Sequence, residues 1–114
     1  MNDYLEILHE YKEDKDIDDL ISDVQKLRYY YSTQQYDLMI QHINNLMIKH
    51  LTETLAWNSV NKIQPVNYDQ SYQNAEDFLQ AKGFVILLKK GYDLSKHLKQ
   101  EEINFIKQMI KPME

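Results

Sequence analysis

The sequence predicts an all-α protein, organised as a single-domain antiparallel bundle of four to five helices over residues 1–114. Apolar side chains recur every three or four residues along most of the chain, which is the spacing of amphipathic helices. The chain has only two glycines and two prolines, so residues that break helices are rare. Alternation of the kind found in strands is absent from windows longer than about five residues.

The first two predicted helices cover residues 2–13 and 17–31. Asn2 or Asp3 can cap the first helix, and Asp16 is the expected N-cap of the second. The second helix has a regular apolar stripe, made of Ile17, Leu20, Ile21, Val24, Leu27 and Tyr31. A stripe of this spacing predicts one buried face.

The third predicted helix runs over residues 34–63 and is the longest, ending before Pro65. It is apolar around much of its circumference, which is typical of a helix with neighbours on several sides. We therefore expect the centre of the bundle on this helix, at Ile40, Ile43, Met47, Leu51 and Leu55.

The fourth and fifth predicted helices cover residues 71–90 and 100–111. Gly83 lowers the stability of the fourth helix by about 1 kcal/mol relative to alanine, unless close packing needs a residue without a side chain there. Gly91 suits the position just after its C-terminus. The fifth helix has five residues that we expect to make apolar contacts: Ile103, Phe105, Ile106, Met109 and Ile110.

Composition excludes several classes of protein. The chain has no cysteine, so disulfides, thiolate metal sites and cysteine nucleophiles are ruled out. Its longest apolar run, residues 84–88, falls far short of the roughly 20 residues of a membrane span. The first ten residues do not have the pattern of a signal peptide. We expect a cytoplasmic protein without membrane attachment.

The charge is acidic and unevenly distributed. The net charge is −5, and residues 1–57 carry 11 acidic and five basic side chains, most of the acids between Glu10 and Asp23. This sign argues against a nucleic-acid ligand. The acids are expected to form a solvated helix junction and to complement the helix dipole, or alternatively a face that meets a basic partner. Twelve lysines against one arginine indicate AT-rich codons, hence a low-GC bacterium or its phage or mobile element.

Tyrosine is abundant, with nine residues, and four of them cluster at positions 29–31 and 36. Three consecutive helical positions span about 200°, so at least one of Tyr29, Tyr30 and Tyr31 should be exposed. Tyrosine is enriched at binding surfaces. The candidate interface residues are therefore Asp16, Asp18, Asp19, Tyr29, Tyr30, Tyr31 and Tyr36. The alternatives are a structural aromatic cluster at a helix end, or base stacking together with Arg28, which the acidic surroundings oppose.

No catalytic residue, metal site or cofactor is predicted. His50 lies on an apolar helix face, where it is either a core histidine with a satisfied hydrogen bond or a general base or pH-sensitive contact. Glu6 and His9 have a spacing found in metal-binding bundles, but they project from the polar side of their helix. Glycine-rich phosphate loops and the common hydrolase motifs are absent.

The segment from Tyr36 to Trp57 resembles the central helix of HEPN-type domains, on the basis of Tyr36, His42, Leu46, Lys49, Leu51 and Leu55. The resemblance covers about a fifth of the chain. HEPN domains are small helical bundles that act as ribonuclease toxins or nucleotidyltransferase partners. Family nucleases carry a histidine four to six residues after an arginine, whereas Arg28 is followed by none before His42. The resemblance thus implies a non-catalytic, HEPN-like role in RNA processing or with a nucleotidyltransferase.

The main hypothesis from the sequence is a small protein–protein interaction module, such as a regulator, inhibitor, immunity protein or antitoxin-type factor. We expect its partner to present a basic surface or one that accepts aromatic side chains, and a homodimer is a further possibility. The runner-up is the HEPN-like protein, or a small hydrolase or nuclease that depends on His50 or His42.

Overall fold

The computed structural model describes residues 3–49 and 67–110, and the regular structure within these ranges is entirely helical. The described helices are α1 (Tyr4–His9), α2 (Lys15–Ser32), α3 (Tyr36–Lys49), α5 (Tyr68–Lys89) and α6 (Gln100–Ile110). The predicted all-α class is confirmed.

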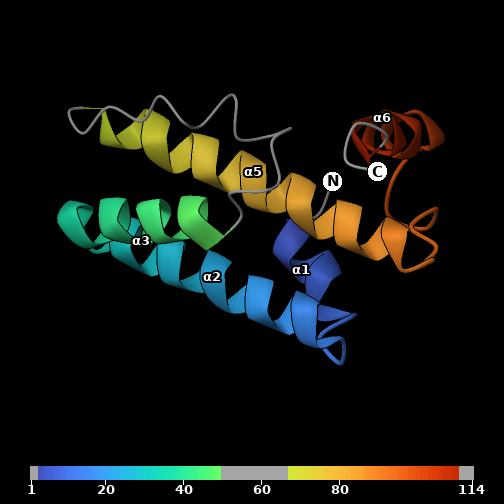
Figure 1. The fold of residues 1–114 in the computed structure, drawn as a ribbon, viewed down its shortest axis with the longest axis horizontal. Coiled ribbons are helices and arrows are strands. Elements are labelled where there is room, and N and C mark those ends of the chain that lie inside the picture. The colour runs from blue at the N-terminus through green and yellow to red at the C-terminus, as the bar shows by residue number, and fades with distance from the viewer. Residues whose placement is uncertain (1–2, 50–66, 111–114) are drawn as a thin grey trace.

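The helices pack as an antiparallel arrangement centred on α5 (Figure 1). α2 runs antiparallel to both α3 and α5, while the short α1 lies between α2 and α5. α6 crosses the C-terminal part of α5 on the side away from α2. Among the described helices, α5 contacts all four others. This central position fits its many buried side chains.

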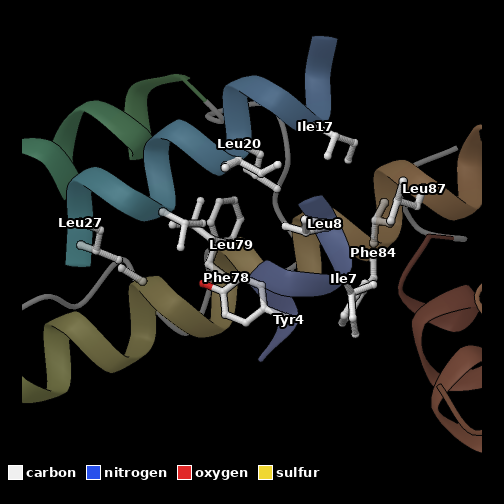
Figure 2. Close-up of a cluster of buried hydrophobic side chains, with 14 of the residues drawn as sticks. Tyr4, Ile7, Leu8, Ile17, Leu20, Leu27, Phe78, Leu79, Phe84 and Leu87 are labelled. Carbon is white, nitrogen blue, oxygen red and sulfur yellow. The ribbon is translucent and has the colours of Figure 1, made fainter. Parts of the chain in front are cut away.

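The core closes where α1 meets α2 and α5 (Figure 2). Leu8 of α1 is fully buried against Gly83 of α5 and Leu20 of α2. A Cβ atom at Gly83 would lie 2.9 Å from Leu8 Cδ2 and 3.1 Å from Leu20 Cδ2. Close packing therefore requires that position 83 carry no side chain, and this requirement accounts for a glycine in the middle of a helix.

Side-chain caps begin the first two helices. Asp3 caps α1 as predicted, with its side chain accepting a hydrogen bond from the Leu5 amide. The prediction for α2 was wrong by two residues: Asp14 caps it, accepting from the amides of Asp16 and Ile17 at 3.0 and 3.4 Å. Asp14 and Asp16 are the same residue type two positions apart, so residue preference alone does not place the cap.

A side-chain cap begins α5, and a glycine follows its end. Asn67 caps the helix by accepting from the Gln70 amide at 3.1 Å, so α5 begins three residues earlier than predicted. Gly91 follows the C-terminus with a φ angle of +87°, as predicted for this position. The next amide, that of Tyr92, donates to the Leu87 carbonyl at 3.0 Å and closes the helix end.

The predicted centre on the third helix is only partly observed. Ile43 is buried, whereas Ile40 and Met47 are half-buried, and α3 also exposes Leu38 and Ile48. The predicted continuation over residues 50–63, with Leu51, Leu55 and His50, lies outside the described residues. The first helix is shorter than predicted, because α1 ends at His9 and turns connect it to α2.

Candidate functional site

The predicted acidic residues divide into two groups. Asp18 and Asp19 are exposed to solvent on α2. Asp16 instead contacts Lys90 after α5, with 2.8 Å between Asp16 Oδ2 and Lys90 Nζ. The same Lys90 bonds Asp14 at 2.7 Å, which lowers the pKa of that carboxyl group and raises the pKa of the lysine. Asp16 therefore helps to join α2 to the end of α5.

Tyr29 is the exposed member of the tyrosine cluster, with 59% of its surface accessible, as the helical spacing predicts for at least one of the three. Tyr30 is half-buried and packs edge-on against His42 of α3. The rings of Tyr29 and Tyr30 lie 5.9 Å apart. Tyr29 thus offers an accessible aromatic ring backed by a packed one.

Tyr31 and Tyr36 take part in a structural aromatic ladder. Tyr31 stacks on Tyr72 of α5 at 3.8 Å, and Tyr36 stacks on Tyr68 at 4.7 Å. The two stacks meet edge-on through Tyr31 and Tyr36, at 6.3 Å. The Tyr31 hydroxyl also donates to Asp69 at 2.6 Å. For these two residues the structure matches the alternative of an aromatic cluster at a helix end.

Asp18, Asp19 and Tyr29 are exposed on the outer face of α2, a surface we define by Asp18, Asp19, Ser22, Lys26 and Tyr29. Asp16 is also exposed but lies on another side of the helix, where it binds Lys90. Asp18 and Tyr29 are eleven residues apart, which places them on the same side of the helix and about 16 Å from each other. The acids and the exposed ring are therefore not adjacent, although both fit within one interface of ordinary size.

The buried histidine among the described residues is His42, while His50 lies outside them. His42 is 6% exposed, and its Nε2 atom lies 2.9 Å from the Asp23 carbonyl oxygen of α2. A carbonyl only accepts, so Nε2 carries the hydrogen and donates it. The imidazole ring thus links α3 to α2 as a satisfied polar group.

One buried carboxylate was not predicted from the sequence. Glu76 of α5 is 8% exposed and accepts hydrogen bonds from the hydroxyls of Tyr4 and Tyr72 and from Arg28 Nε, the last at 2.9 Å. Arg28 also binds Asp3 through both terminal nitrogens, at 2.6 and 2.9 Å. We call these five residues the Glu76 network. It joins α1, α2 and α5.

Burial and neighbouring charges shift the pKa values of the two tyrosines and of Asp3 in this network. Burial and the neighbouring Glu76 carboxylate raise the pKa of both Tyr4 and Tyr72. Hydrogen bonding to Arg28 lowers the pKa of Asp3. The Arg28 guanidinium also lies over the Tyr4 ring, 5.2 Å from its centre. Arg28 is thus engaged inside the molecule, which opposes the base-stacking alternative.

A groove forms where α6 crosses α5, with a volume of about 510 Å³. Phe84, Leu98 and Ile106 are buried and contribute apolar surface to its lining. Phe105 also lines the groove but is 64% exposed. Of the residues expected to make apolar contacts, Ile103 and Ile106 are buried, whereas Phe105 is largely exposed and lies on the opposite side of α6 from Ile103.

Acidic side chains surround this apolar lining. Asp77, Glu101 and Glu102 line the groove, and none of the described residues that line it is basic. Glu102 accepts from the Lys99 amide at 2.9 Å, which caps α6, and Asp77 accepts from Gln73 at 2.9 Å. These bonds are local and leave the negative charges without a cation among the lining residues.

Neither a family model, nor a curated protein, nor a solved structure matches this chain. Within residues 3–49 and 67–110, no group of three or more histidine or acidic side chains has the arrangement of a metal site. None of the described helices is long and apolar enough to cross a membrane.

Proposed function

We propose that this chain is a protein–protein interaction module, of the regulator, inhibitor, immunity or antitoxin type, which binds a basic partner protein through the outer face of α2. The observation that carries the proposal is the exposure of Tyr29. Its ring is 59% exposed and lies 5.9 Å from the ring of its packed neighbour Tyr30. Exposed tyrosine is a frequent anchor of specific interfaces. The acids at positions 18 and 19 would steer a basic partner towards it.

Charge favours a heterologous partner over a second copy. The chain carries a net charge of −5, so two copies meeting through this face would repel each other. The geometry also gives no support to a nuclease that depends on His42, because this histidine is buried and bound to a backbone carbonyl. A binding role requires only the surface residues that are accessible.

The proposal is tested by measuring affinity for a partner captured from the native host and then purified. Tyr29→Ala should weaken binding by about tenfold or more, as expected for an aromatic anchor. Changing Asp18 and Asp19 to Asn should mainly lower the association rate and its dependence on salt. Tyr92→Ala, at another exposed tyrosine, and Glu6→Gln serve as matched controls. A partner bound equally by all of these variants would contradict the assigned surface.

A further inference from the structure

The α5–α6 groove combines an apolar lining with a rim of one charge. Its lining includes an aromatic ring, Phe105, that is 64% exposed. Asp77, Glu101 and Glu102 line the same groove, and no described lining residue is basic. From this chemistry we infer that the groove binds a basic amphipathic helix of a partner protein. This second site goes beyond the proposed function, which uses the outer face of α2.

The dimensions of the groove suit a helix. Its lining residues on α5 run from Asp77 to Phe84, which is two helical turns and about 10 Å. A helix lying in such a groove presents apolar anchors at positions i, i+3 or i+4, and i+7 over the same length. These anchors would contact Phe105 and the buried side chains beside it. Lysine or arginine on the flanks of the helix would face the three carboxylates.

The same charges select against other occupants. A second copy of this chain would bring another acidic groove to the first, and like charges across an interface are unfavourable. Nucleic acids and anionic membranes carry the same sign as the rim and would be repelled. An apolar segment without basic residues would leave the carboxylates partly desolvated and unpaired. A basic amphipathic helix satisfies both parts of the lining.

A defined peptide tests the inference. The probe is a synthetic helix with leucine at positions i, i+4 and i+7 and lysine on the flanking positions, titrated calorimetrically into the full chain. We expect a complex in the micromolar range, and at least about tenfold weaker binding of the same peptide with glutamate in place of lysine. Phe105→Ala should weaken binding of the lysine peptide by about tenfold. Absence of binding, or equal binding of both peptides, would overturn the proposal.

Two charge variants separate a specific groove from general attraction to an acidic protein. Glu101→Gln with Glu102→Gln removes two charges at the groove, and the amide oxygen introduced by Glu102→Gln can still cap α6. Asp18→Asn with Asp19→Asn removes two charges on α2. The first pair should weaken binding by about fivefold and the second by less than about twofold. Equal losses in both pairs would show non-specific attraction and contradict the site.

The proposed interface on α2 and the proposed helix site in the α5–α6 groove can be tested separately. Tyr29→Ala changes the outer face of α2 and should leave the affinity for the peptide unchanged. Circular dichroism checks that each variant keeps its helical content, so that a loss of affinity reports on the groove itself. A loss of peptide binding in Tyr29→Ala with its fold intact would contradict the separation of the two surfaces.

Discussion

Two neighbouring carboxylates on α5 lie in contrasting surroundings. Glu76 is buried and accepts hydrogen bonds from Arg28 and two tyrosines, whereas Asp77 lines the open α5–α6 groove. Both places combine acids with aromatic rings. In the Glu76 network the polar groups bind one another across three helices, whereas Asp77 and Glu102 in the groove make only local hydrogen bonds and Phe105 is largely exposed. Residue type therefore does not identify a binding surface. The two places differ in burial and in the cation that pairs with the carboxylate, since Glu76 binds Arg28 and no described residue that lines the groove is basic.

The largest effect is expected from neutralising Glu76. Glu76→Gln keeps the shape of the side chain but removes charge-assisted bonds, and should lower the free energy of unfolding by about 2 kcal/mol. Asp77→Asn is the matched control one position along, expected to cost less than about 0.5 kcal/mol. Urea unfolding measures both. Similar losses in the two variants would remove the contrast between the two regions.

Part of the fold and of the candidate site could be predicted from the sequence. Helix class, the cap at Asp3 and the turn at Gly91 follow from local rules that need no tertiary structure. A further signal was available: Glu76 occupies a position in an apolar stripe with Tyr72, Ala75, Leu79 and Gly83. A charged residue in such a stripe indicates a buried partner, and the chain has a single arginine.

Other features depend on how the helices pack. Arg28 reaches both Asp3 and Glu76 only because α1 lies between α2 and α5, and sequence separation gives no indication of that. The groove likewise exists because α6 crosses α5 at an angle. The exposure of Phe105 could be predicted, because it lies about 200° from Ile103 around the helix. The groove beside it could not be predicted from the local sequence.

High pH should weaken the Glu76 network. The pKa values of Tyr4 and Tyr72 are raised in the folded protein, so the stability they contribute is fully present below about pH 10 and is lost as pH rises further. Above that value we expect the free energy of unfolding to fall by up to about 1.4 kcal/mol per pH unit for each tyrosine that stays neutral in the folded protein, with a smaller share from the partly exposed Tyr72. Tyr72→Phe should show a shallower decline. Parallel curves for the two proteins would contradict a half-buried Tyr72 that stays neutral in the folded protein.

Low pH gives a smaller effect through Asp3. Its pKa is lowered by Arg28, so its contribution is present above the unfolded value near 4 and is lost as pH falls through the folded value. Asp3→Asn keeps a good cap but weakens the ion pair, which should cost about 0.5 kcal/mol at neutral pH because the pair is partly exposed. The difference from the unmodified chain should vanish once the pH is below the lowered pKa of Asp3 in the folded protein. A difference independent of pH would indicate that the charge of Asp3 is irrelevant.

The central claim is that the Glu76 network stabilises the fold, whereas the groove side chains are left available to a partner. The most direct measurement is the free energy of unfolding of Phe105→Ala, by urea titration. Because the ring is 64% exposed and alanine favours helix, we expect a change within about 0.5 kcal/mol of the unmodified chain. A loss of about 2 kcal/mol or more, typical of a buried aromatic side chain, would show that Phe105 belongs to the core and would contradict the claim.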